Sequence, residues 1–433
     1  MTAHPLAANR TAAERAFAEQ FSAGQGALPL PEREAAFRAF SAKGLPGRRD
    51  EAWHYTDLRQ RLTRVAPPTA APDGAAIEKA RARLAASPSA ATRLVILDGR
   101  FISALSSKPP EGVSVVTLGE DARAGRAAAP DLGATVDGML ALNGALAQGG
   151  CVISVAAGAT VSAPIEVLHW TTSDDRFLAS RVAVEIGANA QVSLVEHFEG
   201  LGAAGQRDVA TILDLGASAV VDHTAIVEGE GALHVESLVA RLGESAELRA
   251  FGYVSNGDLV RRQIFASLVG ENAKIALNGL SLLDGKRHAD TTLVVDHIAP
   301  HGESREFFKH IVADEATGVY QGKVIVQPGA QKTDGGMKSQ AILLSPNAVM
   351  NNKPELEIFA DDVVCGHGAT VGALDREQLF YLRARGIPET EAEAMLLEAF
   401  GFEAIERIAD EALREVLRGK ARGWLAVRAG SIS

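Results

Sequence analysis

The pattern of apolar residues separates the two ends of the chain from its middle. Near the start, apolar residues recur at spacings of three and four, the period of an amphipathic helix, at Ala13, Phe17, Phe21, Ala36, Phe37 and Phe40. Pro31, followed by the segment EREAAFRAF, fits the first turn of a helix. From Cys151 onward this period is absent, and short apolar segments alternate with Gly, Asn and Asp. The middle of the chain is therefore predicted to form short strands joined by turns.

A four-residue unit that begins with glycine recurs through this middle region. GATV begins at Gly158, GANA at Gly187, GASA at Gly216, GESA at Gly243 and GENA at Gly270, with spacings of 29, 29, 27 and 27 residues. Aliphatic residues precede four of these glycines and also follow the same four by five positions. A fixed period of this length is typical of stacked repeats, in which each unit buries its apolar side against its neighbours.

The recurring corner favours a β-solenoid over approximately residues 151–372. Glycine permits a positive φ at a sharp bend, and alanine allows neighbouring coils to approach closely. The alternative is a β-sandwich, which also has short strands and turns but gives no reason for one corner to recur in register. We therefore predict a mainly β chain with three regions: residues 1–150, mostly helical with a small hairpin; residues 151–373, the solenoid core; and residues 374–433, helical.

Two details of the first region are predicted from its turn residues. The segment RLVILDGRFISAL has the pattern of a hairpin that turns at Asp98 and Gly99. The segment DGMLALNGALAQGG is predicted to be a helix that ends at Gly149 and Gly150.

The last region carries a helix start and a large apolar surface. Thr390 and Glu393 have the spacing of a capping box, and Pro388 stands just before them. Apolar stripes follow at Met395, Leu396, Phe400, Phe402, Ile405, Ile408, Ala409, Leu413 and Leu417. A solvated tail does not carry this much apolar surface, so the region is predicted either to pack on the solenoid or to bind a partner.

Composition narrows the classes of function. A net charge of −11 argues against general binding of nucleic acid, because neutralising phosphates requires a basic face. Two cysteines exclude a disulfide framework and indicate a reducing compartment. No apolar segment approaches the roughly 20 residues that cross a bilayer, and the N-terminal segment lacks the apolar region of a secretory signal. The expected location is the cytoplasm.

Motifs for catalysis are few. GVYQGKV (Gly318–Val324) has three residues between its glycines and Val324 where a P-loop has Ser or Thr, so we predict no ATP site on this chain. Asp361 and Asp362 are adjacent and would face opposite sides of a strand. Most of the eleven histidines are isolated, and the group of Asp296, His297 and His301 is equally typical of a polar loop.

The segment VVCGHGATVG carries the most promising ligands for a metal. If it is a strand, Cys365 and His367 face the same side with backbones about 6.6 Å apart. A thiolate and an imidazole suit iron or zinc better than magnesium. A cluster or a structural zinc usually needs four ligands, so this chain would hold at most half of a site. The alternative is that Cys365 is simply a small buried apolar residue and His367 a locally hydrogen-bonded one.

The stretch from Ser304 to Phe400, which includes these residues, resembles the SufB/SufD family of iron–sulfur cluster assembly proteins. DEAWHYTDL, from Asp50 to Leu58, resembles the N-terminal signature of the same family. The resemblance is dense over about the last 130 residues and collinear over nearly the whole chain. Within the family, the chain is more similar to the SufD branch, because SufB members carry several more cysteines and the C-x-H-G-A-T form is that of SufD.

The resemblance implies both a fold and a role. The implied fold is a right-handed parallel β-helix flanked by N-terminal and C-terminal helical regions. The implied role is a non-catalytic scaffold that forms a pseudo-symmetric heterodimer with a SufB-like subunit and docks the SufC ATPase. His367, and less clearly Cys365, are the implied ligands for a transient iron–sulfur cluster shared with the SufB-like subunit. The candidate residues for SufC docking lie in the C-terminal helical region: Thr390, Met395, Leu396, Phe400 and Phe402.

Two alternatives to this role remain open in the sequence. One is a purely structural clamp without metal ligands, and the other is a carbohydrate-active β-helix enzyme, for which no converging set of acids is evident. The sequence also leaves open the cluster type, a homodimer of the isolated chain and the participation of a flavin.

Overall fold

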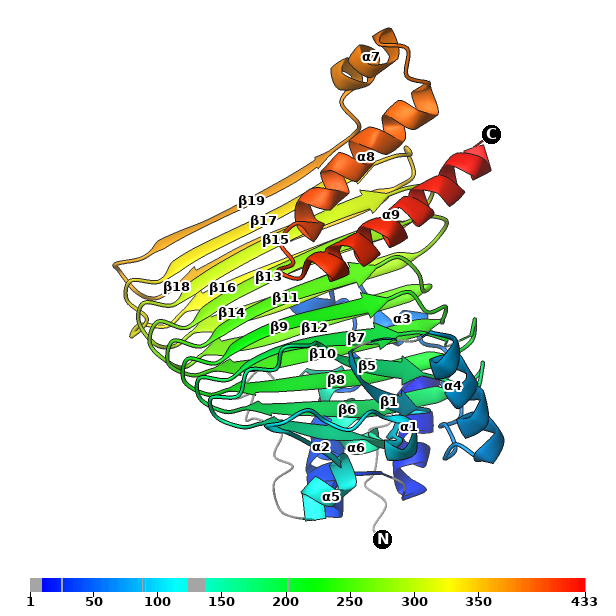
Figure 1. Ribbon diagram of the computed structural model, residues 1–433, viewed down its shortest axis with the longest axis vertical. Helices are drawn as coiled ribbons and strands as arrows, with labels where there is room; N and C mark the ends of the chain where they lie inside the picture. Colours follow the sequence, from blue (N-terminus) through cyan, green and yellow to red (C-terminus); the bar gives the residue numbers. More distant parts are fainter. Residues whose placement is uncertain are drawn as a thin grey trace.

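The chain forms a flattened β-solenoid with helices at both ends (Figure 1). The computed structural model describes residues 10–24, 26–87, 89, 91–123, 137–200 and 202–432, so the outer limits of the predicted regions, at residues 1 and 433, lie outside it. Each turn of the solenoid contributes one strand to each of two sheets, and successive turns stack as parallel neighbours. This arrangement confirms the solenoid predicted from the repeat and not the sandwich.

Sheet A has nine strands, in the order β18-β16-β14-β12-β10-β8-β6-β4-β3. Their bounds are β3 (Val113–Thr117), β4 (Gly149–Val155), β6 (Phe177–Ile186), β8 (Gln206–Leu215), β10 (Leu233–Leu242), β12 (Leu259–Leu268), β14 (His288–His297), β16 (Thr317–Val326) and β18 (Val349–Ile358).

Sheet B has ten strands, in the order β19-β17-β15-β13-β11-β9-β7-β5-β1-β2. Their bounds are β1 (Thr92–Leu97), β2 (Arg100–Phe101), β5 (Ile165–Trp170), β7 (Gln191–Phe198), β9 (Val220–Val227), β11 (Glu247–Val254), β13 (Lys274–Leu283), β15 (Glu303–Val312), β17 (Asp334–Leu343) and β19 (Val364–Gly372).

The first end of the solenoid is built by residues that precede Cys151. Strand β1 pairs with β5 in parallel and with β2 in the predicted hairpin, where Asp98 and Gly99 both have positive φ. Strand β3 pairs with β4 in antiparallel fashion. The sheets therefore begin upstream of the boundary predicted at residue 151, because the hairpin is part of sheet B and not a separate unit.

The recurring corners join β6, β8, β10 and β12 of sheet A to the next strands of sheet B, and they correct one physical expectation. The positive φ belongs to the third residue of the unit, as in Asn189 and Asn272 (both φ 60°), and not to the glycines Gly187 and Gly270. These glycines are needed for space, because a Cβ atom at Gly270 would lie 2.0 Å from the backbone nitrogen of Glu244 in the preceding turn. The corner alanines, Ala190, Ala219, Ala246 and Ala273, are fully buried. Close stacking of turns, and not a left-handed bend, accounts for the glycine period.

The interior of the solenoid is mostly aliphatic, but it holds a buried polar group in its early turns. Glu196 accepts hydrogen bonds from His169 (2.9 Å), His223 (2.8 Å) and the Thr211 hydroxyl (2.8 Å). All four side chains are buried. These hydrogen bonds hold the pKa of Glu196 well below its usual range, although burial alone would raise it. The early turns therefore contain a buried carboxylate whose hydrogen bonds come from three neighbouring strands.

The N-terminal helices cover the start of the solenoid, and most of them lie on its sheet A side. They are α1 (Ala12–Ser22), α2 (Leu30–Lys43), the short helix Glu51–Trp53, α3 (Leu58–Arg61), α4 (Gly74–Ala86), α5 (Leu118–Arg123) and α6 (Gly138–Leu146). Helix α4 packs instead on β1 and β5 of sheet B. Helix α6 begins at its Asp137 cap as predicted, but it ends at Leu146, because Gly149 and Gly150 already belong to β4. The signature segment binds to sheet A: Thr56 and Arg261 both donate to Asp290, and the Arg261 guanidinium lies 4.0 Å from the Trp53 ring.

The C-terminal helices are α7 (Arg376–Ala384), α8 (Glu389–Ile405) and α9 (Glu411–Ile432). Helices α8 and α9 lie on the outer face of sheet B, whereas α7 projects beyond the last strand (Figure 1). The predicted capping box is wrong: α8 starts one residue before Thr390, with Pro388 at the cap position and no side-chain cap. No helix among the described residues is long and apolar enough to cross a membrane.

Candidate metal-ligand site at the open end of the solenoid

Strand β19 is the outermost strand of sheet B and carries both predicted ligands. It pairs with β17 on one side, in a register that places Gly335 beside Cys365 and Met337 beside His367. Met337 is buried in the solenoid core, and Cys365 packs against that core. Side chains alternate along a strand, so Cys365 and His367 face the same side, as predicted, and the structure shows that this side is the interior. Because no described turn follows, His367 is exposed while the equivalent position one strand earlier is buried.

Cys365 is half-buried, and burial raises the pKa of its thiol. The glycine beside it leaves a small space: a Cβ atom at Gly335 would lie 3.4 Å from Cys365 Sγ and 3.5 Å from Ser304 Oγ. The other cysteine, Cys151, is fully buried in the first turns, where burial raises its thiol pKa far above the usual range. Of the two thiols, only that of Cys365 lies where another molecule can reach it.

Polar side chains lie in the core directly behind β19. Glu306 on β15 is in the same inward row as Met337 and His367, and burial raises its pKa to about 8. Its carboxyl oxygens, the Tyr320 hydroxyl and both His310 ring nitrogens are buried without a hydrogen-bond partner among the described residues. Unpaired buried polar groups are rare in proteins. The last turns of the solenoid therefore hold unsatisfied polar atoms in the core near the candidate ligands.

The backbone of β19 has an open edge. The Val364 N–H donates to the carbonyl of Thr333, the residue just before β17 (2.9 Å), and in a parallel ladder the direction of the backbone groups alternates along the strand. The N–H and C=O groups of Cys365, His367 and Ala369 therefore point away from β17, where no described strand lies. The site thus combines two inward side chains with unpaired backbone groups.

Strand β18 is the corresponding edge of sheet A, but its sequence is less open to pairing. The Val349 N–H donates to the carbonyl of Ala316, the residue just before β16, so the backbone of Pro354, on the alternate set of residues, faces the free edge. Proline has no N–H to donate, and it is common on edges that do not pair. The two free edges therefore differ: Pro354 interrupts the backbone donors of β18, whereas the N–H groups of Cys365, His367 and Ala369 are available on β19.

The five residues predicted to dock SufC occupy different environments. Met395 is exposed, and Thr390 lines a pocket of about 460 Å³ between the helices and the end of β17. Leu396 is half-buried. Phe400 lies 4.0 Å from the Lys309 ammonium group, which also pairs with Glu403.

The last of the five, Phe402, also contacts its own chain. Its ring lies 5.1 Å from the Arg422 guanidinium on α9. The apolar stripes of α8 and α9 pack on sheet B through other residues, among them Leu397, Ile405 and Leu417. The sequence predicted that these stripes either pack on the solenoid or bind a partner, and the structure shows that they pack on the solenoid. Fewer apolar residues are therefore left for a partner.

Sequence reasoning missed the exposed aromatic residues of α7. Phe380 is 73% exposed and Tyr381 is 57% exposed, and no residue of α7 is buried. The segment FYLRA could have indicated an exposed aromatic surface, because two adjacent aromatic residues on a short polar helix are difficult to explain in a monomer.

The remaining histidine group does not form a site. His297 is buried, and burial lowers its pKa to about 4, whereas His301 is exposed in the next corner with φ 60°. Among the described residues, no three His, Cys, Asp or Glu side chains are grouped closely enough to hold a metal ion. Cys365 and His367 remain the candidate ligands, and they number only two.

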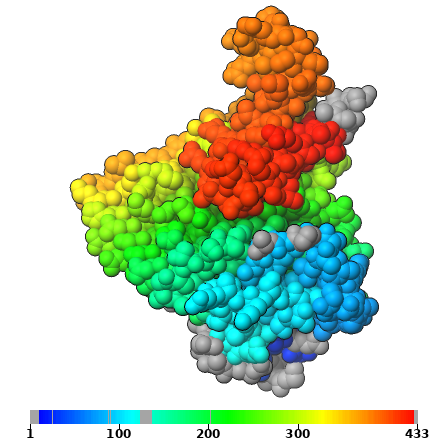
Figure 2. Space-filling model, in the orientation of Figure 1, coloured from blue at the N-terminus to red at the C-terminus, as the bar shows by residue number. Residues whose placement is uncertain are grey.

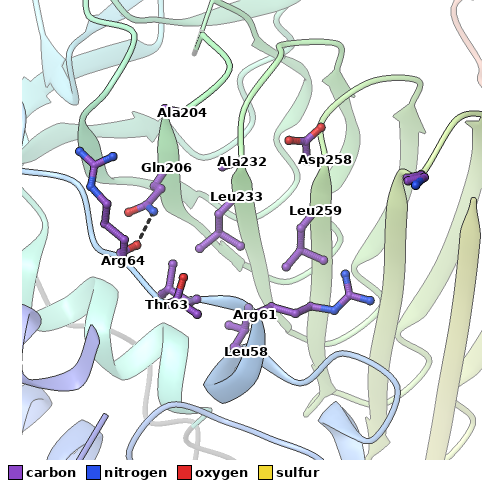
Figure 3. A pocket seen from close by; sticks show the side chains of 12 residues that line it. Leu58, Arg61, Thr63, Arg64, Ala204, Gln206, Ala232, Leu233, Asp258 and Leu259 are labelled. Atoms are coloured by element: carbon purple, nitrogen blue, oxygen red, sulfur yellow. Dashed lines mark hydrogen bonds between the residues drawn. The ribbon is translucent and has the colours of Figure 1, made fainter. Parts of the chain in front are cut away.

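A separate groove lies between the N-terminal segment and the turns of sheet A (Figure 3). It has a volume of about 440 Å³ and an apolar floor that includes Leu58, Leu233 and Leu259. The Gln206 side chain donates to the Arg64 carbonyl (2.8 Å) at one end and so fixes the N-terminal segment to β8. This groove does not include the candidate ligands.

Comparison with known proteins identifies the family. Residues 169–400 match the model of the SUF system FeS cluster assembly SufBD core domain, and residues 27–167 match that of the SufBD protein N-terminal region. The chain belongs to the SufBD family. It is 30% identical to the iron-sulfur cluster assembly protein SufD of Escherichia coli over 397 residues, which is 90% of this chain and 92% of that protein.

Other relatives agree with this assignment. An iron-sulfur cluster assembly SufBD family protein of Synechocystis is 28% identical over 92% of this chain and 91% of its own length. The SufD protein of Bacillus subtilis is 24% identical over 64% of this chain and 65% of its own length. The chain is thus a SufD-type iron–sulfur cluster assembly protein.

Proposed function

We propose that this SufD-type chain is a non-catalytic scaffold that completes an iron–sulfur cluster site together with a SufB-like subunit. The observation that carries the proposal is the position of His367, exposed on the outermost strand and beside unpaired backbone groups. A ligand buried in the middle of the solenoid would have no route to a second chain. The cluster is cargo in this proposal, because two ligands cannot hold it permanently.

The open edge supports a pairing of subunits. An exposed strand with free N–H and C=O groups is a template for another strand, and natural proteins protect an edge that must not pair with charges, proline, bulges or a covering element. Exposed apolar residues at this end support the same conclusion, among them Val364 on β19 (72% exposed) and Phe359 just after β18 (60% exposed). A SufB-like subunit seated there would bring its own ligands close to His367.

The C-terminal helices are the proposed docking site for a SufC-type ATPase. Phe380 and Tyr381 on α7 and Met395 on α8 form the exposed part of this surface. Phe400 and Phe402 contribute indirectly, because their rings hold α8 to β15 and to α9. Since α8 is fixed to β15, two strands from β19, a movement of α8 would reach the open end of the solenoid through rigid strands.

The purely structural clamp is the second candidate, and the raised pKa of Cys365 favours it in part. A thiol that resists ionisation is a poorer metal ligand than an ordinary one. The cluster scaffold requires the His367 imidazole as a ligand, whereas the structural clamp does not. A substitution of His367 therefore distinguishes the two functions.

The experiment is to co-express the chain with its SufB-like and SufC-type partners and to measure iron and acid-labile sulfide in the complex purified without oxygen. His367→Ala is expected to lower cluster content by about tenfold while the complex still assembles, because the imidazole is lost without disturbing the core. His301→Ala, another exposed histidine, is the matched control. Full cluster content in His367→Ala would favour the structural clamp, and failure of the wild-type chain to form a complex would reject both.

A further inference from the structure

Four inward positions on the last two strands of sheet B form a rectangle. The register of β17 with β19 places Gly335 beside Cys365 and Met337 beside His367. Neighbouring strands lie about 4.8 Å apart and alternate residues about 6.6 Å apart, so the backbones of these four residues define a rectangle of about that size. Three of its corners carry a thiol, a thioether and an imidazole. All three side chains project from the same small area of the sheet.

The glycine corner leaves space beside the thiol. A Cβ atom at Gly335 would lie 3.4 Å from Cys365 Sγ and 3.7 Å from Val324 Cγ1, close to ordinary van der Waals contact. Alanine would therefore fit at this position, and glycine leaves about the volume of a methyl group open next to Sγ. The Cys365 side chain thus has room to move toward a ligand above the rectangle.

Met337 is the donor that the sequence did not indicate. Its side chain is buried, and its Sδ reaches across the interior, where a Cβ atom at Gly322 on β16 would lie only 2.5 Å from it. Methionine is unbranched and flexible, so the sulfur can turn toward His367 without a change in the backbone. A thioether is a ligand for soft metals, so Met337 adds little to a site for iron or zinc.

The end of the solenoid that carries the rectangle is open. Figure 2 shows the yellow and orange edge of the solenoid uncovered beside the orange and red helices. His367 is exposed and Cys365 is half-buried, whereas Met337 lies one strand further in. An ion can therefore enter past the imidazole and the thiol to reach the thioether.

The donors and their number together indicate the metal. A structural zinc or a cluster usually needs four ligands, and the rectangle does not supply them. Soft thiolate and thioether ligands select Cu(I). This ion also accepts fewer ligands than zinc or iron, so a thiolate, a thioether and an imidazole from one chain suffice for it.

We propose that the rectangle is a Cu(I) site of the isolated chain, with Cys365, Met337 and His367 as its ligands. Binding replaces the thiol proton by the metal, releases that proton to solvent and changes no oxidation state. Cys365 and His367 are also the candidate cluster ligands, so bound Cu(I) would keep iron from this end of the solenoid. That competition rests on the proposed function, whereas the copper site itself does not.

The test titrates the full chain, purified without oxygen, with Cu(I) in competition with the chromogenic chelator bicinchoninate. The wild-type chain should take a single equivalent from the chelator. Cys365→Ser and Met337→Leu should each lower the affinity by at least about tenfold, the scale on which metal sites respond to lost contacts. Met350→Leu, at a methionine that also packs against the core from β18, is the matched control and should bind as the wild type does. Leucine conserves the volume of methionine, so both methionine variants should keep the thermal midpoint of the wild type.

X-ray absorption should show sulfur and nitrogen neighbours of the copper, with one sulfur fewer in Met337→Leu. Failure of the wild-type chain to compete for Cu(I), or wild-type affinity in Cys365→Ser, would overturn the site. Wild-type affinity in Met337→Leu, or an equal loss in Met350→Leu, would overturn the thioether as a ligand and with it the proposal. No partner is present in these measurements, so each of these failures leaves the scaffold function intact, and cluster content in the complex tests that function separately.

Discussion

The two ends of the solenoid are built in opposite ways. At the first end the sheets finish in the antiparallel strands β2, of two residues, and β3, of five residues, with helices packed around them. At the last end they finish in β18 and β19, parallel strands of ten and nine residues whose outer edges face no described strand. Short edges protect a sheet from further pairing, whereas long open edges invite it.

The two cysteines follow the same division. Cys151 lies in the closed end with no exposure, and Cys365 lies half-buried in the open end. A residue of the same type is a core residue at one end and a candidate ligand at the other because of where the stacking stops. The difference shows that Cys365 is accessible because the described strands of sheet B end at β19.

The largest effect is expected in the closed part, at Glu196. Glu196→Ala would leave two histidines and Thr211 without their hydrogen-bond partner inside the solenoid. At about 1–3 kcal/mol for each unsatisfied group, the free energy of unfolding should fall by roughly 3 kcal/mol or more. Chemical denaturation would measure this loss. Glu185→Ala, on the exposed side of β6, should change stability by no more than about 0.5 kcal/mol, and an equally small loss for Glu196→Ala would contradict the buried network.

The next effect is the dependence of stability on pH, which also arises from buried groups. Burial lowers the pKa of His288 and His297 to about 4 and that of His310 to about 3, and it raises the pKa of Glu306 to about 8. Unfolded His and Glu titrate near pH 6.5 and 4.3. Between these two values, unfolding takes up three protons at the histidines and releases one from Glu306. Stability therefore falls as the pH falls, by roughly 3 kcal/mol per pH unit from these four groups.

A variant of one buried histidine tests the origin of this slope. His297→Gln should reduce the slope of unfolding free energy against pH by about 1.4 kcal/mol per unit, the value for one proton. Chemical denaturation at several pH values would measure the slope. An unchanged slope in His297→Gln would contradict the burial of a neutral imidazole at this position.

A smaller effect is expected from closing the open edge. Ala369→Pro removes an N–H that points away from β17, as Pro354 already does on β18. Binding of the SufB-like subunit should weaken by at least about tenfold, equivalent to 1.4 kcal/mol, with the helices and core retained. Thr370→Pro is the comparison, because its N–H points toward β17 and its loss should destabilise the strand itself. If Ala369→Pro bound the partner normally, the edge of β19 would not be a site of pairing.

The sequence predicts the architecture of the solenoid well because the repeat is a direct consequence of stacking. Each corner must place a small residue against the preceding turn, so Gly187 and Gly270 recur at the period of the structure. The physical reason assigned to them was wrong, since a sequence does not reveal which residue of a corner has positive φ. Likewise, Thr390 has the spacing of a capping box, but Pro388 starts α8 earlier.

The candidate site was predictable in part. That Cys365 and His367 face the same side follows from strand alternation, but their inward direction comes from the register with β17. The exposure of His367 depends on the solenoid ending at β19, which the repeat does not show. The use of Phe400 and Phe402 within the chain depends on distant cations, Lys309 and Arg422, that no local pattern connects to them. The exposed aromatic residues of α7 were missed for the opposite reason, because a short polar helix gives little indication of its neighbours.

The claim on which the account depends is that β19 is an assembly edge, and amide hydrogen exchange tests it most directly. The peptide that spans residues 363–373 should exchange quickly in the isolated chain, because the N–H groups of Cys365, His367 and Ala369 point away from β17 at the open edge. Binding of the SufB-like subunit should slow exchange there by at least tenfold and leave β2 and β3 at the closed end unaffected. Unchanged exchange across residues 363–373 in a complex that has demonstrably formed would contradict the account.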